Sequence, residues 1–398
     1  MLFYIDFENR YFVYKTLLGV TMIKQLLPAL AFGCVFWACE QSTAPQKASN
    51  NKTTVTAVDY SLGRAMNQRL GRGINLGNSW DSDGYDDSGW NNPIRDQDFA
   101  IIKAAGFNSV RIPVRWQNYS DYTTHTVDPE RLKGVMEDIQ LALANNLAVV
   151  VNFHHYTQLN CAGGGGTDEY GEKCEYNEAK FASEKAHFLG MWAQVATAMN
   201  AFPDSLVVLE ILNEPTIPSA TVVDHLMNEA YTVIRAAAPG KTIMFESYHA
   251  AKFADLSILH LPKDGNIIFS GHYYEPYGYT HQGHGYNCIG DNAKGSNAKS
   301  DMASYVGLAY QLYPDVDGFH EIPLNMGEFG VSGGDPAYCN GQAPSNEGKA
   351  EWAKLAVEAA TSHGMSFHYW GFAKTGGFDA YNIDKDVWYP GFPDALLK

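Results

Sequence analysis

Residues 206–215 read LVVLEILNEP, and this stretch decides the fold of the chain. A short apolar run closed by proline is typical of a buried parallel strand. Residues 322–330, IPLNMGEFG, repeat the pattern with glycines after the apolar run. Each stretch carries a glutamate just after its apolar residues, so we predict that Glu214 and Glu328 lie at the rims of two such strands.

Apolar runs of this kind recur along the chain, and stretches with the apolar period of a helix lie between them. The predicted strands are residues 73–76, 109–114, 147–153, 206–212, 242–245, 267–271, 323–326 and 366–370. The predicted helices include residues 95–105, 129–145, 181–201, 221–237 and 347–362. Eight repeats of strand and helix predict a single (β/α)8 TIM barrel over residues 61–398. A doubly wound sheet is the alternative, but it gives no reason for functional residues at nearly every strand end.

The composition also limits the possible functions. The chain has 398 residues, of which 45% are hydrophobic and 13% aromatic. A barrel routinely uses about 250 or more residues as one domain, so this length is compatible with a single barrel. The net charge of −16 argues against a nucleic-acid partner, since phosphates require Lys/Arg patches. The aromatic content fits sugar binding, although core packing uses most of these side chains. We expect a monomer without a cofactor.

The N-terminal residues have the features of an export signal. Residues 1–38 are assigned to it, with Met22 as the true start, followed by one lysine and a short apolar run. Cys39 follows alanine as in a bacterial lipoprotein cleavage site, which predicts a lipid anchor in the outer membrane at Cys39. Phe36 matches such sites poorly, so simple secretion is the alternative. Residues 39–60, rich in small polar residues, are predicted to form a flexible tether.

Four cysteines remain beyond the signal: Cys161, Cys174, Cys288 and Cys339. In an oxidising compartment four cysteines allow three pairings, and the sequence alone leaves them open. The simplest pairing joins Cys161 to Cys174 and Cys288 to Cys339. Each disulfide would then hold loops together on one rim of the barrel. The absence of Cys-x-x-Cys spacing argues against a zinc site.

In a barrel, functional side chains come from the C-terminal ends of the strands. Nearly every predicted strand here ends in polar or aromatic residues: Asn75, Trp80, Arg111, His154, His155, Asn213, Glu246, His272, Tyr274, Glu275 and Trp370. Buried charges are costly without a purpose, so this rim is predicted to be an active site. His154 and His155 could be metal ligands, but adjacent strand residues point to opposite faces, and we expect no metal.

Several rim residues have alternative interpretations. Glu210 lies well before the strand end and is expected to be a structural hydrogen-bonding partner. Glu246 and Glu275 are alternative catalytic carboxylates. The indole side chains near the rim are either platforms for sugar rings or core residues: Trp80, Trp90 and Trp116.

Across residues 62–388 the chain resembles glycoside hydrolase family 5, a family of barrel enzymes. The motifs that carry the resemblance are RGINLGN from Arg72, VRIPV from Val110, NFHH from Asn152, NEP from Asn213, HYY from His272, GEFG from Gly327 and YW from Tyr369. Each motif is weak alone, but all of them in family order are specific. The resemblance implies that Glu214 is the acid/base and Glu328 the nucleophile. The other implied active-centre residues are Arg111, His154, Asn213, His272, Tyr274 and Trp370.

Elementary electrostatics agrees with these roles. Arg111 and Tyr274 would favour an ionised Glu328, whose charge would raise the pKa of Glu214. Asn213 would donate to the sugar 2-hydroxyl, and a carboxyl separation of about 5 Å would indicate retention of configuration. The complete set expected to bind substrate is Asn75, Trp80, Arg111, His154, His155, Asn213, His272, Tyr274 and Trp370.

The sequence therefore predicts an exported, retaining endo-β-1,4-glucanase that acts on cellulose-like or mixed-linkage glucan. Mannan and xyloglucan are the alternative substrates, because specificity depends on loops such as residues 161–174 and 277–300. A surface glycan-binding lipoprotein without activity is the alternative of another class. Paired carboxylates argue against it, since binding alone does not require them.

Overall fold

The computed structural model describes residues 3–6, 11–16, 19–22, 55–168, 170–284, 286–291, 297–333, 339 and 342–398. The chain divides into two units, Met1–Thr53 and Thr54–Lys398. The first contains a small antiparallel sheet of β1 (Phe3–Asp6), β2 (Tyr11–Thr16) and β3 (Gly19–Met22). Most of the predicted signal and tether, including Cys39, lies outside the described residues, so both remain predictions.

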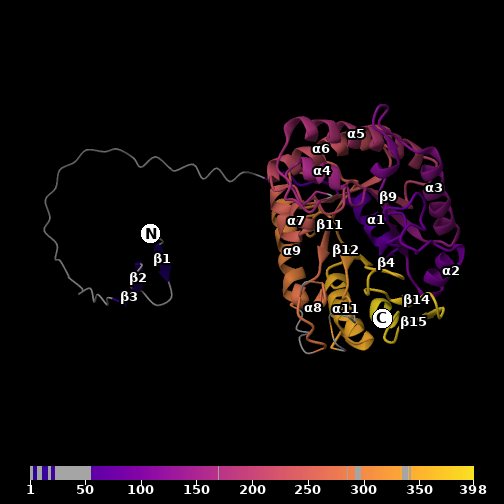
Figure 1. Cartoon of the computed structure of the whole chain (residues 1–398). Coiled ribbons are helices and arrows are strands. Elements are labelled where there is room, and N and C mark those ends of the chain that lie inside the picture. Colours follow the sequence, from indigo (N-terminus) through magenta and orange to yellow (C-terminus); the bar gives the residue numbers. More distant parts are fainter. Residues whose placement is uncertain are drawn as a thin grey trace. The chain divides into compact units, whose positions relative to one another are not determined.

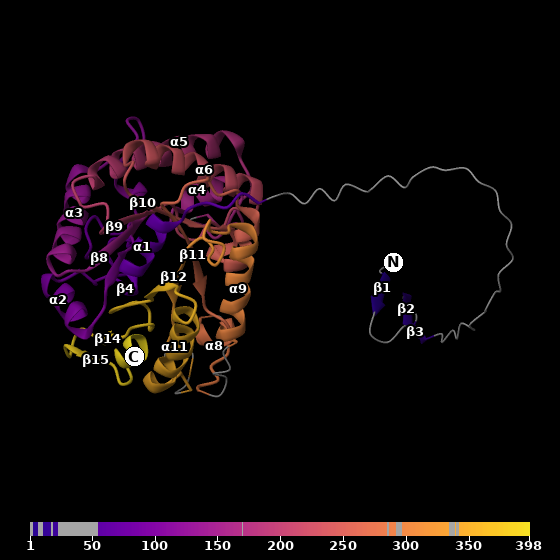
Figure 2. The ribbon, with the colours of Figure 1, turned by 180° about the vertical axis from the view of Figure 1, so that it is seen from behind.

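The second unit is a closed barrel of eight parallel strands, as predicted (Figures 1 and 2). Its strands are β4 (Arg72–Asn75), β5 (Ser109–Ile112), β8 (Ala148–Asn152), β9 (Val207–Glu210), β10 (Thr242–Glu246), β11 (Ile267–Tyr273), β12 (Leu324–Phe329) and β13 (Ser366–Tyr369). They pair in chain order, and β13 closes the barrel against β4. The eight predicted runs are thus confirmed, with ends that shift by a few residues.

Helices surround the barrel: α2 (Asp96–Ala105), α3 (Pro129–Ala144), α5 (Glu178–Met199), α6 (Ala220–Ala237), α9 (Ala298–Leu312) and α11 (Asn346–Thr361). The predicted helices did not include α9, because it buries only Ala298, Met302 and Ala309 and so lacks a full apolar stripe. They also did not include α1 (Ser61–Leu70), whose Met66 and Leu70 pack against Val150 and Val208 inside the barrel.

Short elements lie in the loops between these strands and helices. They are η1 (Gln117–Tyr119), β6 (Ser120–Asp121), β7 (Thr126–Val127), α4 (Thr157–Ala162), α7 (Tyr248–Ala251), η2 (Phe253–Ile258), α8 (Tyr277–Thr280), β14 (Tyr381–Asn382), β15 (Val387–Trp388) and α12 (Asp394–Leu397). In the described part of the chain no helix combines the length and apolar character needed to cross a bilayer.

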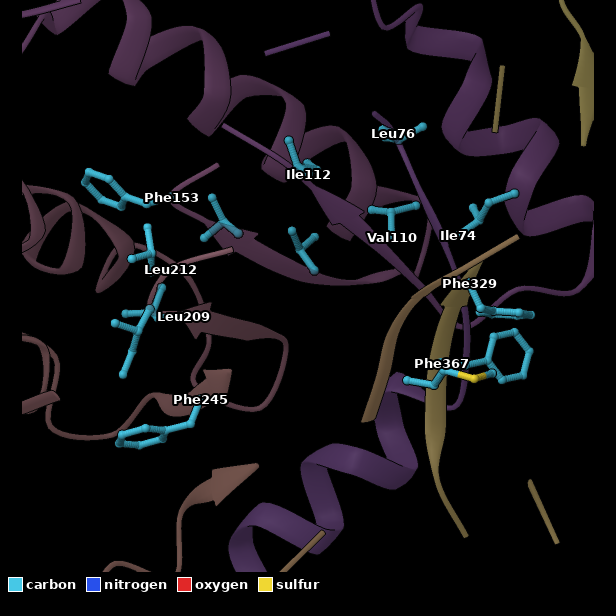
Figure 3. Packing of buried hydrophobic residues seen from close by; sticks show 14 of the residues in the cluster. Ile74, Leu76, Val110, Ile112, Phe153, Leu209, Leu212, Phe245, Phe329 and Phe367 are labelled. Carbon is cyan, nitrogen blue, oxygen red and sulfur yellow. The ribbon is translucent and has the colours of Figure 1, made fainter. Parts of the chain in front are cut away.

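The alternation of side chains along each strand separates an outer apolar layer from an inner one. On β9, Val207 and Leu209 join the core between strands and helices, which Figure 3 shows for Leu209. Val208 belongs to the cluster inside the barrel, and Glu210 follows it on the same face because side chains repeat every two residues. The same period turns Arg111 inward between the outward Val110 and Ile112. The upper interior of the barrel is therefore polar.

The end of the predicted tether belongs to the barrel unit. The Val58 backbone N–H donates to the Pro314 carbonyl at 3.1 Å, and Tyr60 is fully buried. The part of residues 39–60 that remains predicted as a tether therefore ends before Val58.

Both disulfides of the simplest pairing are present. Cys161 is bonded to Cys174, and Cys288 is bonded to Cys339. The first closes a short loop after β8, and the second joins the segment after β11 to the segment after β12.

Candidate active site

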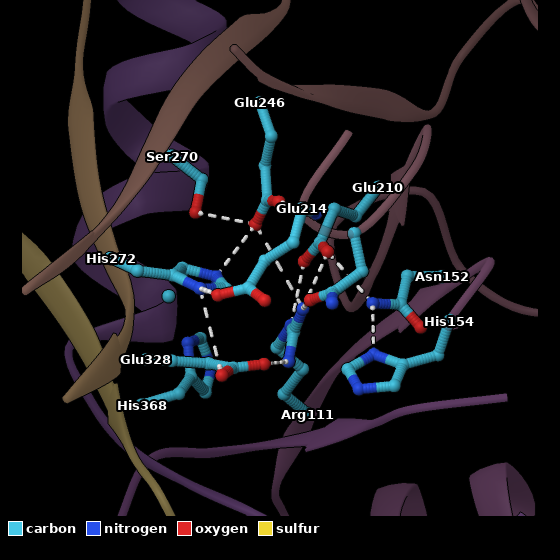
Figure 4. Close-up of polar contacts among 12 residues, drawn as sticks. Arg111, Asn152, His154, Glu210, Glu214, Glu246, Ser270, His272, Glu328 and His368 are labelled. Carbon is cyan, nitrogen blue, oxygen red and sulfur yellow. Dashed lines mark hydrogen bonds and ion pairs between the residues drawn. The ribbon is translucent and has the colours of Figure 1, made fainter. Parts of the chain in front are cut away.

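Arg111 is the centre of the polar network at the C-terminal end of the barrel (Figure 4). Its Nε and Nη2 donate to the two oxygens of Glu210 at 2.7 Å each, and its Nη1 donates to Glu328 Oε1 at 2.7 Å. Nη1 also reaches Asn75 Oδ1 at 2.9 Å, and Nη2 reaches Asn213 Oδ1 at 2.6 Å. The predicted structural role of Glu210 is thus confirmed, since it neutralises a buried guanidinium.

The prediction that Arg111 and Asn75 bind substrate is wrong. Both side chains are 0% exposed, so neither can contact a sugar. Asn75 Nδ2 donates to the carbonyls of Gly327 and His368, and its Oδ1 accepts from Arg111. These residues instead hold Glu328 and Asn213 in place from below.

Glu214 and Glu328 face each other across the top of the barrel. A carboxylate oxygen of each, together with a ring nitrogen of His272, lies within 4.8 Å of the others. This upper limit on the distance between two oxygens is compatible with the predicted carboxyl separation of about 5 Å. Glu214 lies in the loop after β9 with φ 46°, and Glu246 Oε2 accepts its backbone N–H at 2.9 Å. This bond holds a backbone conformation that residues other than glycine rarely adopt.

A register shift between β11 and β12 turns Glu328 toward the site. Gly271 pairs with Met326, but His272 pairs with Glu328, so Gly327 is the additional residue of a bulge. A Cβ on Gly327 would lie 2.4 Å from Ser270 Oγ, which only glycine avoids. The motif glycine before Glu328 therefore has a packing reason.

His272 links three carboxylates. Its Nδ1 is 2.7 Å from Glu214 Oε1 and 3.6 Å from Glu328 Oε2, and its Nε2 is 2.9 Å from Glu246 Oε1. Burial alone would lower the pKa of His272, but the charges of Glu328 and Glu246 and the hydrogen bond to Glu214 outweigh burial and raise it well above its ordinary value. The raised pKa favours the imidazolium form of His272.

The pKa shifts of Glu214 and Glu328 differ from those expected from the sequence. Burial raises the pKa of Glu328 to about 7, although His272 and Arg111 oppose this. Burial also raises the pKa of Glu214, but the hydrogen bond and charge of His272 outweigh it and lower this pKa. The free protein is therefore not a simple pair of ionised Glu328 and protonated Glu214. A proton taken up near neutral pH belongs to the interacting pair.

Other predicted residues surround the carboxylates. Tyr274 donates to Glu328 Oε2 at 3.1 Å, and burial and the charge of Glu328 raise the pKa of Tyr274, which keeps the phenol protonated. Asn213 accepts from Arg111 through Oδ1, which leaves its Nδ2 as the donor. Trp370 stacks on His154 with ring centroids 5.7 Å apart.

Trp80 is not a sugar platform. It is 6% exposed, its Nε1 donates to Asp138 on α3 at 2.6 Å, and Arg131 lies over its ring. Trp116 is completely buried, and its Nε1 donates to the Asn152 carbonyl. Trp90, which is 41% exposed, keeps a surface for stacking.

His154 and His155 do not point apart as expected. The chain leaves β8 at Asn152 and His155 has φ 55°, so the two rings lie 4.1 Å apart. With Asp81 they bring one possible metal-ligand atom each within 4.8 Å. Asn152 Nδ2 donates to Glu210 and faces His154 Nδ1 at 3.3 Å, which places the proton of His154 on Nε2 and opposes metal binding there.

Asp81 is a site residue that the sequence analysis missed. Its Oδ2 is buried and has no hydrogen-bond partner among the residues that the structure describes, 3.8 Å from His155 Nε2 and 4.0 Å from His154 Nε2. Burial raises the pKa of Asp81 to about 6. The only signal was its place directly after Trp80 in the loop that follows β4.

A cavity of about 920 Å³ lies among the loops that follow β5 and β8. Arg115, Gln158 and both cysteines of the Cys161–Cys174 disulfide line it. The Arg115 guanidinium lies 5.7 Å from the Trp90 ring, which is 6.4 Å from the His155 ring. The loop expected to affect specificity thus lines a cavity next to the aromatic side of the site.

A parallel (β/α)8 barrel with paired carboxylates at its C-terminal end defines the class of barrel glycoside hydrolases. Comparison with protein families gives the particular family. Residues 71–376 match the cellulase model, so the chain belongs to glycosyl hydrolase family 5.

Named relatives are similar at modest identity. Endoglucanase H of Acetivibrio thermocellus is 25% identical over 84% of this chain, which spans 33% of that relative. Endoglucanase A of Clostridium longisporum is 26% identical, with 88% of this chain and 68% of the relative covered. Endoglucanase Cel5A from Thermotoga maritima superimposes with a TM-score of 0.70 at 28% identity, over 85% of this chain and all of that one.

Proposed function

We propose that this protein is a retaining endo-β-1,4-glucanase. One observation carries the proposal: oxygens of Glu214 and Glu328 approach within 4.8 Å. Retention requires carboxyls about 5–5.5 Å apart, whereas inversion needs about 6.5–9.5 Å to admit a water.

In the proposed reaction Glu328 attacks the anomeric carbon while Glu214 protonates the departing glycosidic oxygen. A glycosyl–enzyme ester forms, and Glu214 then takes a proton from the water that hydrolyses it. Arg111 and Tyr274 stabilise the carboxylate of Glu328. The Nδ2 of Asn213 would donate to the 2-hydroxyl, a bond that strengthens in the transition state.

The substrate is tested by reducing-sugar release from a panel of polysaccharides. We expect the highest rate on carboxymethylcellulose or barley glucan, with a rapid fall in viscosity that indicates internal cleavage. Higher rates on galactomannan or xyloglucan would replace glucan as the substrate. Mannan is a specific rival, because a Thermotoga maritima Cel5A structure 28% identical to this chain holds mannotriose. Binding without release on every polymer would support the non-catalytic alternative.

We also propose that the protein is exported and carries lipid on Cys39. The support is the short apolar run that ends before this cysteine. Mass spectrometry of the native protein should show an N-terminal peptide that begins at acylated Cys39. A soluble, unmodified protein cleaved at another position would indicate ordinary secretion.

A further inference from the structure

Glu246 is a buried carboxylate at the end of β10 that neither catalytic role uses. Both of its carboxylate oxygens are linked to Glu214, one directly and one through His272. Oε2 accepts the Glu214 backbone N–H at 2.9 Å, and Oε1 lies 2.9 Å from Nε2 of His272, whose Nδ1 contacts Glu214 Oε1 at 2.7 Å (Figure 4). Ser270 Oγ lies 3.5 Å from Glu246 Oε1. Glu246 therefore touches the backbone of Glu214 directly and its carboxylate through one imidazole ring.

The hydrogen-bonding capacity of each group determines the proton positions. Burial raises the pKa of Glu246, and the charge of His272 opposes this rise. When Glu246 is ionised its carboxylate only accepts, so Nε2 of His272 then carries a hydrogen toward it. The raised pKa of His272 favours a second proton on Nδ1, which makes the ring a cation and faces Glu214 Oε1 at 2.7 Å. The other oxygen of Glu214 then remains for the glycosidic oxygen.

We infer that Glu246 is a positioning residue that keeps His272 charged, so that His272 holds Glu214 Oε1 as an acceptor and Glu214 carries its catalytic proton on Oε2. The inference rests on the proposed function, in which Glu214 is the acid/base. No proton is gained or lost by Glu246 in the reaction. Its charge determines which atoms of the neighbouring groups hold protons.

Other charges around the pair do not replace this contact. Arg111 Nη2 lies 3.8 Å from Glu246 Oε1, but Arg111 donates at 2.7 Å to Glu210 and Glu328. His272 is thus the cation in direct contact with Glu214. The titratable groups that face Glu214, Glu246 or His272 are Arg111, His155, Glu210, Tyr274, Tyr277, His281 and Glu328.

Glu246→Gln tests the inference. The Glu214 N–H and His272 Nε2 contact different oxygens of Glu246, and in glutamine one of these two positions carries an NH2 group that cannot accept. The amide also has no negative charge to stabilise an imidazolium. In ¹⁵N NMR, the His272 ring should change from imidazolium in the wild type at pH 7 to neutral in the variant. This measurement does not depend on activity, so it separates failure of this inference from failure of the proposed function.

Activity provides the second readout. Without the nearby cation the pKa of Glu214 should rise, and the basic limb of kcat/KM for an aryl β-cellobioside should move up by about one pH unit. KM should change less than kcat. Glu246→Asp, which keeps the charge, should retain the wild-type limb at a lower rate. Glu358→Gln, which removes an exposed charge on α11, should leave the profile unchanged.

A double-mutant cycle shows whether Glu246 acts through His272. His272→Gln should reproduce the shifted limb, and adding Glu246→Gln should change it little further, because the two positions act as one unit. An imidazolium that persists in folded Glu246→Gln would overturn the inference. So would a rate loss that is equal at every pH, or full additivity in the cycle. If Glu246→Gln does not fold, a neutral His272 in folded Glu246→Asp also contradicts it.

Discussion

Glu328→Ala is expected to lose activity on every glucan and on aryl β-cellobiosides, by about 10⁴-fold or more, because no glycosyl–enzyme can form without the nucleophile. Arg111 and Tyr274 would still face the site but would have no carboxylate to stabilise. Initial rates on a 2,4-dinitrophenyl β-cellobioside measure the loss with little dependence on leaving-group protonation.

Two controls accompany this variant. Glu328→Gln keeps the shape of the side chain and should be as inactive, which separates loss of the carboxylate from creation of a cavity. A thermal melt should show that both variants fold. Near-native rates on glucan in either variant would remove Glu328 from the catalytic assignment.

Glu214→Ala is expected to affect substrates unequally. Cleavage of glucan should fall by about 10²–10⁴-fold, the usual range for general acid–base assistance. The first step with a 2,4-dinitrophenyl leaving group should survive far better, because this group departs without a proton. The glycosyl–enzyme then waits for water without a general base. Added azide, which needs no base, should restore turnover and give a β-glycosyl azide.

The configuration of the azide product assigns the two carboxylates. A β-azide from Glu214→Ala fits Glu214 as acid/base and a retained covalent intermediate. A β-azide from Glu328→Ala, together with an α-azide or no rescue from Glu214→Ala, would reverse the roles. Chromatography and NMR of the product distinguish the two outcomes.

The strands were predictable because a fully buried parallel strand needs a continuous apolar run, as Val207 to Glu210 illustrates. The sequence predicted that Glu328 lies at the rim, but it did not predict that its side chain points into the barrel. Asn325 is on the inner face of β12, and strict alternation would turn Glu328 outward. The bulge at Gly327 adds one residue to β12, so the Glu328 side chain points into the barrel. This bulge arises from the pairing of β11 with β12.

The tryptophans near the rim differ in burial, and the sequence could not predict this difference. Trp80, Trp90 and Trp370 all follow strand ends or lie near them, yet Trp80 packs against α3, Trp90 is exposed, and Trp370 stacks on His154. Which neighbour an indole meets depends on the helix that packs outside the strand, and that contact is not local in the chain.

The sequence by itself determined the barrel and the two glutamates at its rim, because both depend on local apolar period and turn residues. The disulfide pairing was left open by the sequence and is decided by the structure. Only the tertiary structure decided how protons and charges are held. Arg111 and Glu328 are 217 residues apart, and Glu214 and Glu246 are 32 residues apart, yet each pair is in hydrogen-bond contact. The pKa of a buried carboxyl depends on its desolvation and on such neighbours, which come together only when the barrel closes.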